Sequence, residues 1–179
     1  MPNLWHELPT GPHPPERVYA IIEIPSGSRN KYEYSKRTGV IILNRVLYSS
    51  VHYPGDYGLI PRTFYDDGDP LDILVMTTQP TFPGCVIEAR PIGIYRMIDR
   101  GKADDKVFAV PATDPNFADI HRLEDVPAHF RAEVAHFFST YKQLENIKVE
   151  PVGWEPAEFA MEQIGRAMRL YNEHYSGIG

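Results

Sequence analysis

The hydrophobic pattern of this chain changes period before its last third. Runs of apolar and β-branched residues with the length of strands cover residues 18–24, 31–34, 40–48, 71–76, 86–98 and 106–110. From Phe130 onward, apolar residues recur at steps of three and four, which is the spacing of one face of an amphipathic helix. Strands that precede helices in this way predict a single α+β domain.

Two helices are predicted in the last third. The first presents an apolar face made of Phe130, Val134, Phe137, Tyr141 and Leu144. The second begins near Pro156, because proline is favoured in the first turn of a helix. Its apolar stripe consists of Ala157, Met161, Ile164, Met168, Tyr171 and Tyr175. Such stripes most often pack against a core, so we expect both helices to cover the strands.

Length and composition indicate the number of domains and the cellular location. The 179 residues suit one domain, 1–179, in which residues 1–15 form an irregular Pro-rich arm. Cys85 is the only cysteine, which suits a reducing compartment. No apolar run reaches the length of a membrane span, and the first residues lack the pattern of a signal peptide. We therefore predict a cytoplasmic protein, and the net charge of −6 disfavours a nucleic-acid partner.

The most informative segment is acidic. Residues 66–72 hold four carboxylates, and their mutual repulsion is costly unless they are solvated or share a cation. Gly68 and Pro70 favour a tight turn, and carboxylate oxygens suit Mg²⁺, Mn²⁺ or Ca²⁺. An EF-hand that started at Asp67 would need glycine where Asp72 stands. Two interpretations stay open at this point, a divalent-cation site and a solvated acidic turn.

Further charged residues occur at strand ends and inside strands. Asp99, Asp104 and Asp105 flank a glycine-containing loop, and two acidic clusters that faced each other would hold several metal ions. Glu23 and Arg45 interrupt apolar runs, where a charge needs a partner or a polar cavity. Together these residues indicate a mixed-charge cavity, in which carboxylates bind divalent cations and basic residues bind an anion. Phosphate chemistry uses that combination.

The sequence resembles the soluble family I inorganic pyrophosphatases in their compact, bacterial-type form. The segment 67–73 matches the aspartate signature of that family throughout. The other matches, in family order, are Glu23 before Pro25, Lys31 to Glu33, Arg45, Tyr53 to Gly58, Asp99, Asp104, Lys106, and Tyr141 with Lys142. One departure is Asp56, which stands where the family more often has asparagine.

The resemblance implies a fold, a reaction and a set of roles. The implied fold is a small twisted OB-like β-barrel with two C-terminal helices packed outside. The implied reaction is Mg²⁺-dependent hydrolysis of inorganic pyrophosphate to two orthophosphates by a metal-activated water, with Asp69 as the general base. The implied metal residues are Asp67, Asp72, Asp99, Asp104, Glu23 and Glu33. The implied phosphate-binding residues are Lys31, Arg45, Tyr57, Lys106, Tyr141 and Lys142. Several Mg²⁺ ions, replaceable by Mn²⁺ or another divalent ion, and a homohexamer are also implied.

Two other hypotheses compete with this one. A metal-dependent nucleotide phosphohydrolase would need a feature that recognises a base or a ribose, and no motif indicates one. A non-catalytic OB-type module for single-stranded nucleic acid would need a basic groove with stacking aromatics. The expected groove is instead rich in carboxylates. We therefore expect pyrophosphate as a small-molecule substrate and no nucleic-acid or membrane partner.

Overall fold

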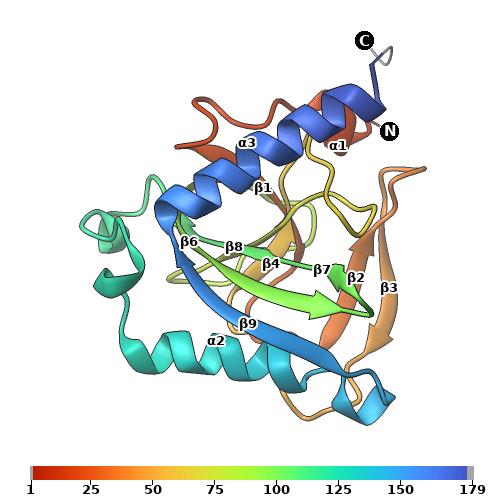
Figure 1. The fold of residues 1–179 in the computed structure, drawn as a ribbon, viewed down its shortest axis with the longest axis vertical. Coiled ribbons are helices and arrows are strands. Elements are labelled where there is room, and N and C mark those ends of the chain that lie inside the picture. Colours follow the sequence, from red (N-terminus) through yellow and green to blue (C-terminus); the bar gives the residue numbers. More distant parts are fainter. Residues whose placement is uncertain (1, 177–179) are drawn as a thin grey trace.

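The strands form a coiled sheet that has helices on two of its sides (Figure 1). The structure is a computed structural model that describes residues 2–176. Its strands are β1 (Val18–Ile24), β2 (Asn30–Tyr34), β3 (Ile41–Val46), β4 (Asp56–Leu59), β5 (Asp72–Val75), β6 (Val86–Asp99), β7 (Lys102–Ala103), β8 (Lys106–Pro111) and β9 (Val149–Pro156). Its α-helices are α1 (Leu4–Glu7), α2 (Ala128–Thr140) and α3 (Ala157–His174), and its 3-10 turns are η1 (Pro115–Phe117), η2 (Leu123–Asp125) and η3 (Gln143–Glu145).

The main sheet coils because its longest strand pairs on both sides. The strand order is β1-β4-β5-β8-β6-β7, and β9 also pairs with β6. The first residues of β6 pair with β1 as well, so that the pairings run around a ring through β1, β4, β5, β8 and β6. A register shift between Pro91 and Gly93 bends β6 along this path. The hairpin of β2 and β3 is a separate two-stranded sheet.

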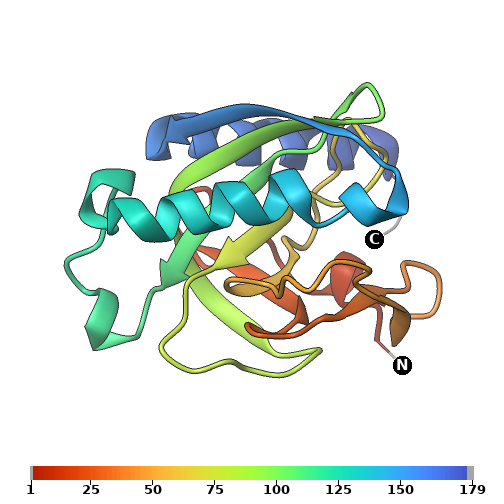
Figure 2. The same cartoon turned by 90° about the horizontal axis from the view of Figure 1, so that it is seen from below.

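The two C-terminal helices pack against different clusters of strand side chains. In β5, Ile73 and Val75 belong to the cluster that includes residues of α3, whereas Leu74 belongs to the cluster that includes residues of α2. Figure 2 shows α2 on one side of the strands and α3 on the other. Strands buried on both faces read as continuous apolar runs, which explains why β5 and β8 lack alternation in the sequence. The predicted α+β fold with two helices outside the sheet is confirmed.

The first predicted helix is shorter than its periodicity indicates. Helix α2 ends at Thr140, and Tyr141 is its C-cap. The chain then turns through η3, and the left-handed backbone of Asn146, at φ 58°, ends the turn. Leu144 was predicted on the apolar face, but it is 65% exposed. Steps of three residues fit a 3-10 turn as well as a helix, so periodicity alone did not separate the two.

The predicted second helix is confirmed from its start. Pro156 is the N-cap of α3, and the helix continues to His174. Its buried face differs by one position from the predicted stripe, because Ala160 and Ala167 are buried while Met161 and Met168 are half-buried. Small residues at the contact let the helix backbone approach the sheet closely.

The N-terminal arm is not wholly irregular. It contains α1, and the buried Trp5 donates from Nε1 to the carbonyl oxygen of Thr63 at 3.0 Å. The Trp5 ring also makes edge contacts with Tyr171 and Tyr175, so α1 lies beside the end of α3 (Figure 1). Among residues 2–176, no helix combines the length and the apolar character that a membrane crossing needs.

Candidate active site

A cavity of about 510 Å³ lies where the β2–β3 hairpin, the acidic turn, the start of β8 and the end of α2 meet. Every site residue proposed from the sequence lines it. These residues are Glu23, Lys31, Glu33, Arg45, Tyr57, Asp67, Asp69, Asp72, Asp99, Asp104, Lys106, Tyr141 and Lys142. The expectation that the charges at Glu23 and Arg45 face a polar cavity is confirmed, and the individual roles stay predictions.

The carboxylates of Asp67, Asp72 and Asp104 form an acidic wall of the cavity. Lys106 lies among them, because strand register places it beside Asp72. β5 and β8 run parallel, and Asp72, the first residue of β5, pairs directly with Lys106, the first residue of β8. Lys106 Nζ donates to Asp72 Oδ2 at 2.6 Å, to Asp104 Oδ1 at 2.6 Å and to Tyr57 Oη at 2.9 Å. Lys106 is only 2% exposed, so these three partners replace its water shell.

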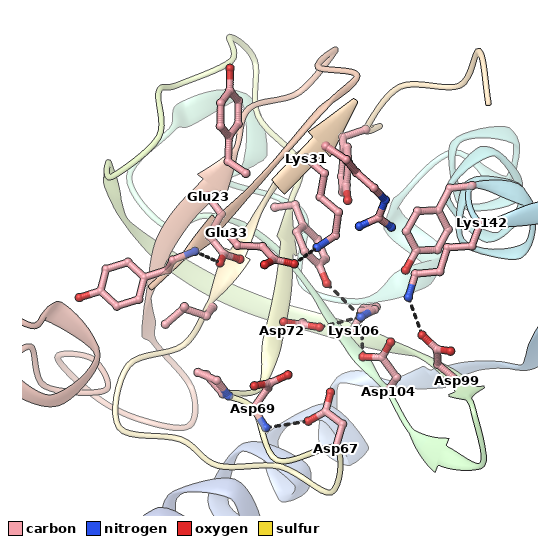
Figure 3. A pocket seen from close by; sticks show the side chains of 18 of the residues that line it. Glu23, Lys31, Glu33, Asp67, Asp69, Asp72, Asp99, Asp104, Lys106 and Lys142 are labelled. Atoms are coloured by element: carbon pink, nitrogen blue, oxygen red, sulfur yellow. Dashed lines mark hydrogen bonds and ion pairs between the residues drawn. The ribbon is translucent and has the colours of Figure 1, made fainter. Parts of the chain in front are cut away.

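The acidic segment forms the predicted tight turn. Tyr65 N donates to Asp69 O at 2.8 Å, and Gly68 N donates to Tyr65 O at 3.0 Å. Gly68 has φ +87°, a conformation that favours glycine. Asp67 Oδ1 accepts from Asp69 N at 3.0 Å. These bonds fix the turn, and Asp67 faces Asp72 and Asp104 across the cavity (Figure 3).

Three carboxylates meet at a position that fits a divalent cation. Asp67, Asp72 and Asp104 each offer one oxygen, and the three oxygens lie within 4.8 Å of one another. With Lys106 they carry a net charge of −2 when all four groups are ionised. Hard carboxylate oxygens in such a cluster suit Mg²⁺ or a similar ion. The expectation that the two acidic clusters face each other is therefore confirmed.

Burial shifts the pKa values of the charged side chains in the cavity. Burial, helped by the charge of Asp72, raises the pKa of Asp67 to about 7. Burial also raises the pKa of Glu23 to about 7, although the backbone N–H of Tyr34 opposes the shift. For Lys106, burial lowers the pKa, but the carboxylates of Asp104 and Asp72 outweigh it and raise the pKa well above its ordinary value. Lys106 is therefore charged near neutral pH, where Asp67 and Glu23 are partly protonated in the absence of a cation.

Basic side chains also line the cavity. Lys31 and Arg45 lie directly opposite each other in the β2–β3 hairpin. Lys142 Nζ, just past α2, donates to Asp99 Oδ2 at 2.5 Å. The guanidinium of Arg45 ion-pairs with Glu145, with Nε 2.7 Å from Oε1. These cations suit the oxygens of a bound phosphate.

Several lining residues were not proposed from the sequence. Lys36, Arg100 and Lys102 add positive charge, and Lys36 ion-pairs with Asp69. Arg100 and Lys102 lie between the acidic residues of one loop, a position that was a usable signal. Glu145, which pairs with Arg45 but does not itself line the cavity, carried no such signal, because it is 100 residues from Arg45.

Three acidic residues near the motifs face away from the cavity. Asp66 pairs with Arg166, with Oδ1 2.5 Å from Nη2. Asp105 accepts a hydrogen bond from the hydroxyl of Tyr65. Asp56, the departure from the family pattern, is fully buried and accepts from Ser26 N at 2.8 Å and from Thr81 N at 3.0 Å. Its carboxylate ties together two connecting segments and does not line the cavity.

The raised pKa of Glu23 predicts a pH dependence of stability in metal-free protein. The folded-state pKa of about 7 exceeds the ordinary value of 4.5, so this contribution is full below about pH 4.5 and is lost as the pH rises through 7. We expect a loss on the order of 3 kcal/mol, measured by urea unfolding in chelator at several pH values. Glu23→Gln keeps the acceptor for Tyr34 N and should remove this part of the slope. An equal slope in both proteins would contradict the assignment.

Carboxylates beside lysine and arginine, held on an α+β body, are the combination used by enzymes that hydrolyse phosphate compounds with divalent cations. A model of the inorganic pyrophosphatase family matches residues 20–172. The inorganic pyrophosphatase of Haloferax volcanii is 51% identical over 177 residues, which are 98% of this chain and 100% of that protein. That of Halalkalibacterium halodurans is 51% identical over 157 residues, or 88% and 96% of the two chains. The chain belongs to the inorganic pyrophosphatase family.

The solved structures agree with this assignment. The crystal structure of inorganic pyrophosphatase from Thermus thermophilus aligns with a TM-score of 0.92 and 43% identity, over 96% of this chain and 99% of that one. The resemblance to family I and the prediction of an enzyme are therefore confirmed.

Proposed function

We propose that this chain hydrolyses inorganic pyrophosphate to two orthophosphates in a Mg²⁺-dependent reaction. The observation that carries the proposal is the trio Asp67, Asp72 and Asp104, whose oxygens lie within 4.8 Å of one another beside the buried Lys106. This trio shares its cavity with the cations of the β2–β3 hairpin and Lys142. The cavity thus offers ligands for cations and for an anion at once.

The residues proposed to bind metal ions fall into a central group and an outer group. Asp67, Asp72 and Asp104 would hold the central ions, while Asp99, Glu23 and Glu33 would contribute around them, some through water. Bound divalent cations lower the pKa of a coordinated water and neutralise charge on a leaving phosphate. Mn²⁺ would substitute for Mg²⁺, because it accepts the same hard oxygen ligands.

The side chains of this chain supply the remaining chemistry. Asp69 is 52% exposed at its side chain and would accept the proton of the attacking water. Lys106, kept charged by its carboxylate neighbours, would neutralise phosphate charge from within the acidic wall of the cavity. The remaining phosphate ligands would be Lys31, Arg45, Tyr57, Tyr141 and Lys142.

Phosphate release from pure pyrophosphate tests the proposal. We expect rapid release with Mg²⁺, loss of release on adding a chelator, and recovery when Mg²⁺ is restored in excess. Nucleoside triphosphates serve as the comparison substrate, and release from them should be much slower. Absence of release from pyrophosphate with Mg²⁺ and with Mn²⁺, over about pH 6 to 9, would overturn the proposal.

Arg45→Ala is expected to weaken pyrophosphate binding. Removal of one charge-assisted contact costs about 1.5 to 3 kcal/mol, so KM should rise at least about tenfold. Arg37→Ala is the matched control, since Arg37 is exposed at the tip of the same hairpin and does not line the cavity. Steady-state kinetics at saturating Mg²⁺ measure both variants. Unchanged KM and kcat/KM in Arg45→Ala would remove Arg45 from the binding site.

The assembly and location are also proposals. We infer a homohexamer of one-domain subunits, supported by the apolar side chains of Ile42, Leu43, Val46 and Tyr48, which are about half exposed or more. Light scattering should give about six times the chain mass of 20.4 kDa, and a mass of one chain would contradict the hexamer. A single cysteine supports a cytoplasmic location.

A further inference from the structure

The two loops that carry the metal carboxylates touch each other outside the cavity. The hydroxyl of Tyr65 donates to Asp105 Oδ2 at 2.7 Å. Tyr65 lies two residues before Asp67, and Asp105 directly follows Asp104. Tyr65 is 4% exposed and Asp105 is 2% exposed, so this contact is sealed from solvent. Neither residue lines the cavity.

Asp105 is anchored to β6 as well as to Tyr65. Its Oδ1 accepts from Met97 N at 3.3 Å, and its Oδ2 lies 3.4 Å from Arg96 Nε. The neighbouring backbone is fixed to the same strand, because Asp104 N donates to Met97 O at 2.9 Å. A buried carboxylate without hydrogen-bond partners would be costly, and the Tyr65 hydroxyl gives the shortest of these bonds.

Tyr65 is fixed on its other side by α3. Its hydroxyl lies 3.2 Å from the side-chain amide of Gln163, and the guanidinium of Arg166 lies 5.5 Å from the centre of its ring. Arg166 also ion-pairs with Asp66 in the acidic turn. The ring packs in the cluster that α3 shares with β5 and β8. The hydroxyl is thus held in place to bridge the two loops.

We propose that Tyr65 and Asp105 are positioning residues that hold Asp67 and Asp104 at the separation needed for a shared cation, and so set the affinity for divalent ions. This inference rests on the metal role proposed for Asp67 and Asp104. Three carboxylates within 4.8 Å repel one another, and Lys106 forms ion pairs with two of them, Asp72 and Asp104. The Tyr65–Asp105 bond opposes the separation of the two loops before any cation binds.

Holding the two loops in place should change the affinity for the metal ion and leave the affinity for pyrophosphate unchanged. Groups that orient metal ligands typically change metal affinity by about 10- to 100-fold when they are removed. Tyr65→Phe keeps the buried ring and removes only the hydroxyl, so the fold should be retained. We expect Mn²⁺, measured by calorimetry without substrate, to bind about tenfold more weakly to Tyr65→Phe than to the wild-type protein. The Mg²⁺ concentration for half-maximal activity should rise by a similar factor, while KM for pyrophosphate at saturating Mg²⁺ stays constant.

Tyr171→Phe is the matched control. It removes another buried tyrosine hydroxyl, which lies 2.5 Å from Nδ1 of His6 in α1, and Tyr171 does not line the cavity. We expect it to lower thermal stability and to leave Mn²⁺ affinity unchanged. Equal weakening of Mn²⁺ binding in both tyrosine variants would mean a general effect of stability and would overturn the inference.

A double-mutant cycle with Asp105→Ala, which removes the acceptor of the Tyr65 hydroxyl, tests whether the hydroxyl acts through Asp105. If it does, the double variant binds Mn²⁺ no more weakly than Asp105→Ala alone. Additive losses, or wild-type affinity in Tyr65→Phe, would overturn the inference. If Tyr65→Phe did not fold, wild-type Mn²⁺ affinity in Asp105→Ala would overturn it by itself. A wild-type protein that bound no Mn²⁺ would overturn the proposed metal function too, so the two failures are distinguishable.

Discussion

Asp69→Asn is expected to lower kcat by about two to four orders of magnitude, with KM for pyrophosphate changed by less than about threefold. Asparagine has nearly the shape of aspartate but does not accept a proton near neutral pH. The turn should persist, because its bonds run through the Asp69 backbone and the Asp67 side chain. Steady-state kinetics at saturating Mg²⁺ give both parameters.

Asp66→Asn is the matched control for this prediction. It makes the same change of charge in the same turn, but Asp66 pairs with Arg166 and does not line the cavity. We expect its kcat to stay within about threefold of wild type, since half-exposed ion pairs contribute little stability. A normal kcat in Asp69→Asn would exclude Asp69 as the general base. A large rise in KM with little change in kcat would instead indicate a role in ground-state binding.

Lys106→Met is expected to destabilise the metal-free protein by about 3 to 5 kcal/mol. Methionine fills a similar volume but leaves the carboxylates of Asp72 and Asp104 without their shared cation. Urea unfolding in chelator measures the loss. Added Mg²⁺ should recover more stability in this variant than in the wild-type protein, because the ion relieves a repulsion that Lys106 otherwise relieves.

Lys148→Met tests whether the effect depends on position. Lys148 is exposed, and its replacement removes the same charge outside the cavity, so stability should change by about 0.5 kcal/mol or less. If Lys106→Met were as stable as the wild-type protein in chelator, the buried Lys106 would not be the compensating charge of the acidic wall.

The strands with long apolar runs were predictable, β6 even across Pro91 and Gly93, whereas β9 was not predicted. β1 occupies the predicted residues 18–24, and β6 and β8 differ from prediction by one residue at their ends. β9 contains Pro151 and Gly153, which argue against a strand, and it forms because β6 offers a free edge along much of its length. The pairing of β9 with β6 depends on tertiary structure, so the local sequence carries no signal of it.

The same contrast holds for the candidate site. Its lining was predictable because the metal and phosphate residues occur in short motifs with recognisable spacing. The supporting contacts were not, because they depend on how distant segments meet. Tyr65 and Asp105 are 40 residues apart, and neither residue type indicates the other. The end of α2 belongs to the same class, since Lys142, next to the C-cap residue Tyr141, bonds to Asp99, which is 43 residues away.

The independence of the β2–β3 hairpin suggests a route to altered substrate size. Within residues 2–176, this hairpin is a sheet of its own, closed at its tip by the bond from Ser35 N to Val40 O, and it carries Lys31 and Arg45. The cluster of Asp67, Asp72 and Asp104 rests on other segments. Insertions confined to residues 35–40 could therefore be screened for longer polyphosphates without rebuilding the ion-binding part, in the way that an antibody loop is diversified on a constant framework.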